Sequence, residues 1–218
     1  MAKAANMPPD RDVPDDKSIR TVNNLKDFVG ESFGPDANAI RLKRTLSADF
    51  NAAAVDLNRI FSDRRENFKG MKYLSEADLQ SARLQANKET QKALDIIIDD
   101  IRSLKKTWDT VCLRLITSSE GRIEKFHTDG TDAHLGRVLC SYNEPTTLGL
   151  LPQDAVKNGR DDTYNPAPGA KPFDLRAGDL WRCAGTFAAK TANVPPFVHR
   201  APSDKSLRLL LVGDGPLR

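Results

Sequence analysis

The stretch "TVCLRLITS", residues 110–118, decides the fold class because the periodicity of the chain changes there. It is rich in residues that favour strands, and a polar turn, "SSEGR" (118–122), follows it. Before this stretch, apolar residues recur at spacings of three and four, which is the period of a helix. After it, short runs of strand-forming residues are separated by turn residues. The sequence therefore predicts a helical N-terminal half and a C-terminal half built from strands.

The N-terminal half contains two apolar stripes at helical spacing. The first stripe consists of Leu46, Phe50, Ala53, Leu57 and Ile60. The second belongs to a helix that opens at "SEAD" (75–78), which resembles a capping box, and that is predicted to run to about residue 108. Its stripe consists of Leu94, Ile97, Ile101, Leu104 and Trp108. We therefore predict a helical region over residues 19–109, preceded by a disordered tail over residues 1–18, which are rich in Pro, Asp and Lys.

The C-terminal half contains several short strand signals. They are "GRVLCSY" (136–142), two strands around a Gly-Asp turn in "PFDLRAGDLWRCAG" (172–185), "PPFVHRAP" (195–202) and "LRLLLVGD" (207–214). The proline-containing stretch 149–172 is predicted as a long loop. Strands of this kind without helices between them predict a sandwich, jelly roll or barrel over residues 110–218. The expected fold class is α+β, with the helical half packed on the β-fold.

Composition and charge exclude several classes of protein. The 218 residues carry a formal net charge of only +3, without a run of five basic residues, so neither a nucleic acid nor a membrane is an expected partner. The three cysteines are odd in number and far apart, which argues against a disulfide framework and a four-cysteine zinc site. The N-terminus lacks the apolar segment of a signal peptide. These features predict a cytoplasmic protein.

The histidines suggest a metal site. In "EKFHTDG" (124–130), His127 and Asp129 flank one residue, so on an extended backbone both side chains project to one face, with Cα atoms roughly 7 Å apart. His199 is the candidate third ligand. Two imidazoles and one carboxylate leave positions open for other ligands, which suits Fe(II), but the same set with a water describes an open zinc site. His134, in a polar loop, is predicted to lie at the rim of the pocket or to contact substrate.

An arginine on the last predicted strand suggests an anionic ligand. Arg208 shares a strand face with Leu210 and Val212, which places its guanidinium toward an apolar interior. A buried arginine is costly without an anionic partner, and its planar fork matches a carboxylate, such as that of an organic diacid. The alternatives are an exposed outer face or an ion pair with Asp174 or Asp179.

The order of the motifs carries a resemblance. "FHTDG", "GRVLCSYNE", "LRAGDLWRCAG", "FVHRAP" and "LRLLLVGD" occur in the order seen in Fe(II)/2-oxoglutarate-dependent dioxygenases. They also resemble a bacterial family of uncharacterised domains with a Phe-His-x-Asp motif, a Leu-Cys-x-Tyr strand and a terminal His-Arg…Arg-Leu-Leu-Leu. The resemblance covers residues 108–214 and implies a double-stranded β-helix of the jelly-roll or cupin type, beginning at residue 110.

The resemblance assigns roles to residues of this chain. It implies a catalytic Fe(II) centre whose ligands are His127, Asp129 and His199. It further implies that Arg208 binds the distal carboxylate of 2-oxoglutarate and that Tyr142 donates a hydrogen bond to this co-substrate. Arg200 could compete for the anion, but its side chain should point to the face opposite His199. Two departures stand out, since "EPTTLGLL" (144–151) replaces a Gly-Gly-acidic phrase and Leu210 replaces the serine of an Arg-x-Ser pair.

Three functions follow as hypotheses. The leading one is a non-haem oxygenase of the hydroxylase type, which uses Fe(II), 2-oxoglutarate and O2 on a small-molecule or peptide substrate. The alternative is a non-catalytic metal-binding or ligand-sensing module that holds zinc or another divalent ion. The weakest is a structural β-domain whose histidines have no ligand.

Overall fold

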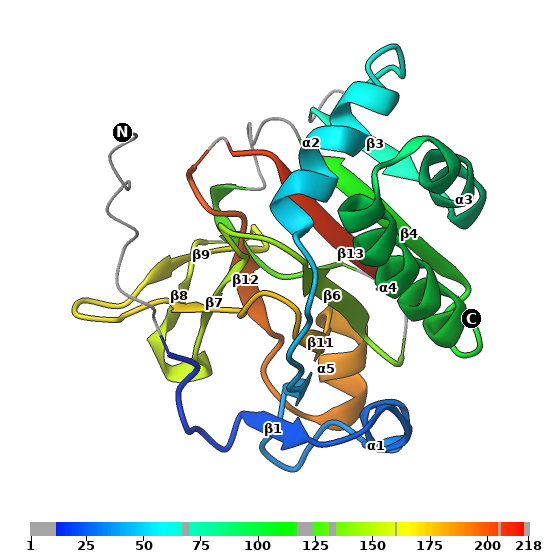
Figure 1. The fold of residues 1–218 in the computed structure, drawn as a ribbon. Coiled ribbons are helices and arrows are strands. Elements are labelled where there is room, and N and C mark those ends of the chain that lie inside the picture. The colour runs from blue at the N-terminus through cyan, green and yellow to red at the C-terminus, as the bar shows by residue number, and fades with distance from the viewer. Residues whose placement is uncertain are drawn as a thin grey trace.

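Two β-sheets and a layer of helices make up the structure (Figure 1). It is a computed structural model, and it describes residues 12–66, 70–116, 124–130, 134–159, 161–204 and 206–215. The large sheet has the order β1-β2-β11-β6-β13-β4-β3 and the small sheet the order β10-β7-β12-β5-β9-β8. Among the described strands, only β1 and β2 pair in parallel. The expected α+β fold, with a double-stranded β-helix, is confirmed.

The strands are short, and the two sheets draw on both halves of the chain. The large sheet contains β1 (Ile19–Val22), β2 (Ala39–Leu42), β3 (Met71–Leu74), β4 (Thr110–Ile116), β6 (Arg137–Ser141), β11 (Leu180–Cys183) and β13 (Arg208–Asp214). The small sheet contains β5 (Phe126–His127), β7 (Leu148–Leu150), β8 (Ala155–Lys157), β9 (Thr163–Pro166), β10 (Phe173–Asp174) and β12 (Val198–Arg200).

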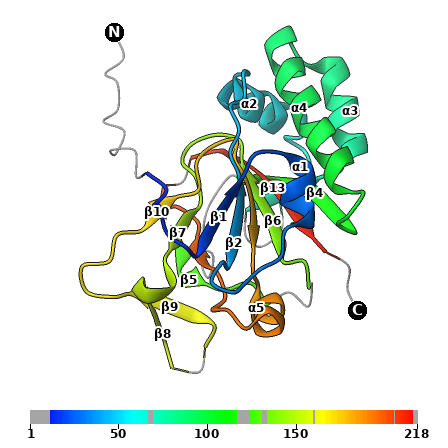
Figure 2. The same ribbon diagram turned by 90° about the horizontal axis from the view of Figure 1, so that it is seen from below.

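The helices are α1 (Leu25–Gly30), α2 (Phe50–Ile60), α3 (Glu76–Gln85), α4 (Lys88–Leu104) and α5 (Thr186–Ala192), with a short 3-10 turn, η2 (Pro152–Asp154). Four of the five described α-helices, α1 to α4, contribute to the core on the outer face of the large sheet, and α5 packs in a separate cluster. Figure 2 shows α3 and α4 on the side of the large sheet opposite the small sheet. No described helix has the length and apolar character needed to cross a membrane.

The alternation of side chains along the strands separates two environments. On β13, Leu209 and Leu211 belong to the core beneath the helices, together with Leu94 and Ile97 of α4. The intervening residues of β13 point to the other side of the sheet, where Val212 packs in a second apolar cluster. One face of the large sheet therefore packs against the helices. The other face of this sheet points toward the small sheet.

A buried polar network fastens α4 to the large sheet. Asp100 of α4 accepts a hydrogen bond from the Tyr142 hydroxyl at 2.7 Å and one from Nη1 of Arg44 at 2.6 Å. Nη2 of Arg44 also lies 3.5 Å from the sulfur of Cys140. Burial raises the pKa of Cys140 to about 12, so this thiol stays protonated and neutral. The network satisfies polar groups that would otherwise be costly in this core.

The N-terminal half is less uniformly helical than its sequence predicted. It supplies β1, β2 and β3, which extend the large sheet at both edges. The predicted long helix is two helices, because the Asn87 side chain caps α4 by accepting from the backbone N–H groups of Glu89 and Thr90. The capping box at Ser75 is confirmed. The first stripe is also confirmed in α2, although this helix begins at Phe50, after its cap Asp49.

The C-terminal half also departs from expectation in two places. The stretch 149–172, predicted as a loop, contains the paired strands β8 and β9. Helix α5 lies between β11 and β12, where no helix was expected. Of the predicted disordered tail, residues 1–11 lie outside the described residues, and residues 12–18 lead into β1.

Gly149 holds the small sheet close to its neighbours. It pairs with His199 of β12 and with Phe173 of β10. A Cβ at this position would lie 2.6 Å from Cζ of Phe173, whose ring is packed against Trp181 and Phe197. We expect Gly149→Ala to lower the free energy of unfolding by about 1–3 kcal/mol, as measured by urea denaturation, because the ring has no room to move.

The matched control is Gly30→Ala, since a Cβ there meets nothing within 4 Å. This variant should unfold at the same urea concentration as the unmodified protein or slightly above it. Equal losses of stability in the two variants would contradict the assigned role of Gly149.

Candidate metal centre

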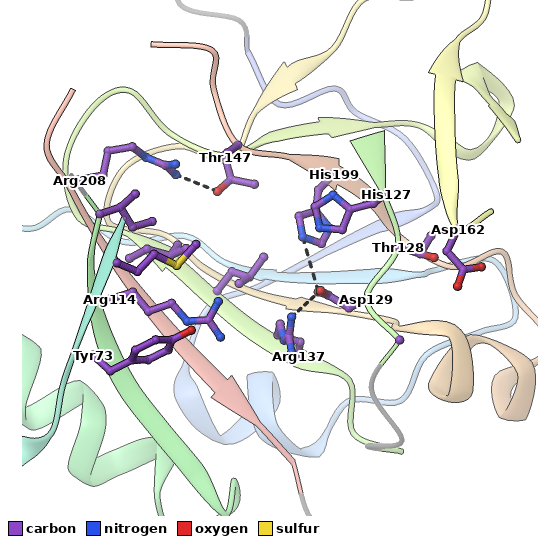
Figure 3. A pocket seen from close by; sticks show the side chains of 16 residues that line it. Tyr73, Arg114, His127, Thr128, Asp129, Arg137, Thr147, Asp162, His199 and Arg208 are labelled. Atoms are coloured by element: carbon purple, nitrogen blue, oxygen red, sulfur yellow. Dashed lines mark hydrogen bonds and ion pairs between the residues drawn. The ribbon is translucent and has the colours of Figure 1, made fainter. Parts of the chain in front are cut away.

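Strand pairing brings the two predicted histidine ligands together. His127 of β5 and His199 of β12 are direct partners in an antiparallel pair, so both imidazoles stand on one face of the small sheet. Their ring centroids are 4.7 Å apart. Asp129 follows β5 by two residues and points at the same place (Figure 3). Each of the three residues offers a ligand atom, and these atoms all lie within 4.8 Å of one another.

A hydrogen bond orients the imidazole of His127, and Asp129 lies next to that of His199. Nδ1 of His127 lies 2.8 Å from the carbonyl oxygen of Lys125. A carbonyl can only accept, so Nδ1 carries the proton and Nε2 is left as the ligand atom. Nε2 of His199 lies 3.5 Å from Oδ2 of Asp129. The donor set therefore consists of two imidazole nitrogens and one carboxylate oxygen.

Asp129 has one oxygen held and one free of hydrogen bonds. Nη1 of Arg137 donates to Oδ1 of Asp129, while Nε and Nη2 of the same guanidinium bind the two carboxylate oxygens of Asp214 at 2.7 and 3.1 Å. Oδ2 of Asp129 is buried without a hydrogen-bond partner and faces the histidines. A buried carboxylate oxygen of this kind fits a divalent cation held by these three residues.

The protonation states also suit a metal ion. Burial lowers the pKa of His199 to about 4, although the charge of Asp129 opposes the shift, so the imidazole is neutral near pH 7. Burial alone would raise the pKa of Asp129, but the charges of His199, Arg137 and His127 outweigh it, and this pKa lies below its usual value. A neutral imidazole and an ionised carboxylate are the ligating forms.

A cavity of about 310 Å³ adjoins the three candidate ligands. The large sheet supplies the wall opposite the histidines, and Arg208 lies on that wall (Figure 3). The Arg208 side chain has the orientation that the alternation along β13 predicted, and the residue is only 1% exposed. Nη2 of Arg208 donates to Oγ1 of Thr147 at 3.2 Å, and its Nε has no hydrogen-bond partner.

The Arg208 guanidinium remains charged in spite of its burial. Burial lowers its pKa to about 10, against the opposing charge of Glu144, so the group is protonated at neutral pH. Neither Asp174 nor Asp179 pairs with it, since Asp179 binds Arg41 at 2.6 Å and Asp174 accepts from Thr146 at 3.5 Å. The described residues give this buried cation one hydrogen bond, to a neutral hydroxyl, and this favours an anionic ligand in the cavity.

Three residues named in the sequence analysis do not line this cavity. Tyr142 follows Val138 and Cys140 on the helix side of the sheet, so the expected hydrogen bond to a co-substrate is corrected to one with Asp100. His134 is exposed in the turn before β6. The Arg200 guanidinium lies over the Phe126 ring at 5.1 Å.

Two further arginines of the cavity wall, Arg114 and Arg137, escaped the sequence analysis. Both lie on predicted strands, and both occupy the positions that alternate with core residues such as Leu113 and Val138. The reasoning that placed Arg208 in the interior would have found them too.

Arg137 is expected to act as a positioning residue for the metal. Replacing it by glutamine removes the donor that holds Oδ1 of Asp129 and so frees the carboxylate to turn. We expect Arg137→Gln to weaken Co(II) binding by about 10- to 100-fold, measured by calorimetric titration. The exposed Arg59→Gln variant is the control and should bind Co(II) as the unmodified protein does. Unchanged affinity in a folded Arg137→Gln protein would contradict this role.

Comparisons with solved structures find chains of similar architecture. The chain is similar to AtDAO1, a dioxygenase for auxin oxidation from Arabidopsis thaliana in a 2-oxoglutarate complex, with 12% identity, a TM-score of 0.44, and 91% of this chain and 93% of that chain covered. It is also similar to the dioxygenase for auxin oxidation (DAO) in rice, with 14% identity, a TM-score of 0.42, and 81% of this chain and 72% of that chain covered.

A third similar structure is the epimerase SnoN in complex with Fe3+, alpha ketoglutarate and nogalamycin RO, with 15% identity, a TM-score of 0.36, and 81% of this chain and 77% of that chain covered. No curated protein matches the sequence. Residues 26–214 match a family described as "Protein of unknown function (DUF1826)". The match spans α2 to α5, every described strand except β1, and all three candidate metal ligands, and the chain belongs to this family.

Proposed function

We propose that this protein is a non-haem Fe(II)/2-oxoglutarate-dependent oxygenase of the hydroxylase type. The observation that carries the proposal is the placement of two complementary groups on one cavity. His127, Asp129 and His199 converge at one end of the cavity, and the buried guanidinium of Arg208 lies on its opposite wall. The first group suits a divalent metal with open positions, and the second suits the far carboxylate of a diacid.

Each end of the cavity has a defined task in this proposal. The three ligands hold Fe(II), and Arg137 keeps Asp129 oriented so that one carboxylate oxygen binds the metal. Arg208 and Thr147 bind the distal carboxylate of 2-oxoglutarate. When bound, Fe(II) and 2-oxoglutarate supply the activation of dioxygen, with succinate and carbon dioxide formed as the substrate is hydroxylated. The chain itself provides binding, orientation and a buried setting.

The charge of Arg208 favours this function over a non-catalytic module. A site that holds only zinc or another divalent ion needs the three ligands and a water, but it leaves a buried cation without an anion. A co-substrate with two carboxylates satisfies both groups at once. The substrate that we propose is a small molecule or a peptide side chain, since a cavity of about 310 Å³ must also hold the co-substrate.

The first test is an anaerobic titration with Fe(II) and 2-oxoglutarate. A visible metal-to-ligand charge-transfer band should appear, and it should be absent in Asp129→Ala because the sole carboxylate ligand is lost. Asp162→Ala is the control, since Asp162 lines the cavity but pairs with Lys157 instead of joining the ligands. Tightly bound zinc without a band or succinate formation would favour the metal-binding module. Unchanged metal content in His127→Ala and His199→Ala would favour a structural domain.

The second test concerns the co-substrate. Arg208→Met should raise the Kd of 2-oxoglutarate by about 30-fold or more, which corresponds to losing about 2 kcal/mol from a buried charged contact. Binding of the metal alone should not change. Arg200→Met is the control because its side chain points to the opposite face, and it should leave the Kd within about two-fold. A larger effect in Arg200→Met than in Arg208→Met would show that the anion binder was misassigned.

A further inference from the structure

The cavity wall carries a second arginine that the proposed co-substrate does not use. Arg114 lies at the centre of three adjacent strands, where it pairs with Tyr73 of β3 on one side and with Leu210 of β13 on the other. All three of these residues line the cavity. In the neighbouring row, Arg208 of β13 pairs with Ile116 of β4, so the two arginines stand on adjoining rows of one wall.

Arg114 lacks an acidic partner in the described part of the chain. Its Nε is buried and makes no hydrogen bond, and its guanidinium lies over the Tyr73 ring, 5.4 Å from the ring centre. The neighbouring Cys112 does not neutralise it, because burial raises the pKa of this thiol and keeps it protonated. Arg114 also contributes to the lowered pKa of Asp129, so its charge acts toward the metal end of the cavity.

The arginines of β2, β6 and β11 differ from Arg114, because each binds acidic side chains or backbone carbonyl oxygens. Arg137 binds Asp129 and Asp214, and Arg41 binds Asp179. Arg182 donates to backbone carbonyl oxygens, including that of Val29 at 2.7 Å. Arg208 and Arg114 differ from these arginines. Among the described residues, neither guanidinium that faces the cavity has an ion pair with a carboxylate or a hydrogen bond to a backbone carbonyl oxygen.

Among the described residues, the groups that line the cavity and their ion-pair partners leave one positive charge unmatched. The carboxylates of Asp129 and Asp214 together offset Arg137 and half of the charge of a divalent metal. The two carboxylates of 2-oxoglutarate offset the remaining positive charge of the metal and the positive charge of Arg208. Asp162 is paired with Lys157. Arg114 then retains an unmatched positive charge at a site where water is displaced, which disfavours the filled cavity unless an anion binds there.

We propose that Arg114 binds the carboxylate of an organic-acid substrate, a conclusion that rests on the proposed oxygenase function. A single unmatched charge fits a monoanion, and the planar fork of arginine matches a carboxylate. The apolar lining around it, from Met71, Ile116 and Leu210, fits the hydrocarbon body of such an acid. Tyr73 is 44% exposed, so this end of the cavity lies next to solvent and gives a route of entry.

The test uses protein loaded with Mn(II) and 2-oxoglutarate, which binds ligands without turnover. Benzoate, phenylacetate and hexanoate serve as probes, each with its neutral amide as the matched control. Paramagnetic broadening of the probe protons in NMR spectra reports binding near the metal. We expect the proton signals of at least one carboxylate probe to broaden, and those of the amides to stay unchanged. We further expect Arg114→Gln to weaken binding of that carboxylate by about ten-fold or more, with partial rescue in Arg114→Lys.

Calorimetric titration of 2-oxoglutarate separates this inference from the proposed function. Both Arg114 variants should keep the Kd of 2-oxoglutarate within about two-fold of the unmodified protein. A loss of 2-oxoglutarate binding with no loss of probe binding would overturn the inference, because Arg114 would then serve the co-substrate. Failure of every carboxylate to bind the loaded protein, or equal binding to Arg114→Gln, would also overturn it. Failure of the unmodified protein to bind 2-oxoglutarate at all would instead count against the proposed function.

Discussion

The site depends on the register between two short strands of the small sheet. β5 and β12 pair so that His127 and His199 stand directly opposite each other, and Asp129 follows on the same side. A shift of one residue in either strand would turn one imidazole to the opposite face. The register is held from the side by β7, where Gly149 pairs with His199 and leaves no space for a side chain next to Phe173. The candidate metal ligands are thus placed by backbone pairing.

The same alternation gives the large sheet two unlike faces. Beneath the helices, its side chains form a continuous apolar core. Toward the small sheet, it presents Arg114, Arg137 and Arg208. Placing three cations on one face is unfavourable unless anions accompany them, and of these three arginines only Arg137 forms direct ion pairs with carboxylates of the described residues. The apolar face therefore stabilises the fold, while the charged face is built for ligands that neutralise it.

Simple strand periodicity was enough to predict much of the site. His127 and Asp129 are two residues apart, and Arg208 alternates with core leucines, so short-range spacing placed them correctly. The same spacing puts Tyr142 on one face with Val138 and Cys140, on the helix side of the sheet. The place at the co-substrate was implied by the resemblance alone. Arg114 of β4 and Arg137 of β6 alternate with core residues in the same way as Arg208, but the second sheet that covers their face of the large sheet is made by pairing between distant segments.

The N-terminal half shows where local patterns cannot decide. β1, β2 and β3 have four residues each, too few for a periodic signal, and their partners are 20 to about 140 residues away in the chain. The break between α3 and α4 is likewise set by one side chain, that of Asn87, within a stretch whose apolar spacing favours a continuous helix. Pairing with distant strands and capping by a single residue both override the average preference of a segment.

Through β3, the N-terminal half of the chain also supplies residues that line the cavity. The candidate metal ligands lie on the small sheet or directly after its strand β5, and this sheet belongs wholly to the C-terminal half. Met71 and Tyr73 of β3 also line the cavity, on the side of the large sheet. β3 is the last strand of the large sheet, so this part of the cavity lies at a sheet edge. The N-terminal half therefore does more than cover the core. Because substitutions at a sheet edge disturb fewer paired neighbours than substitutions at its centre, β3 can vary in shape and charge while the register of the metal ligands is kept.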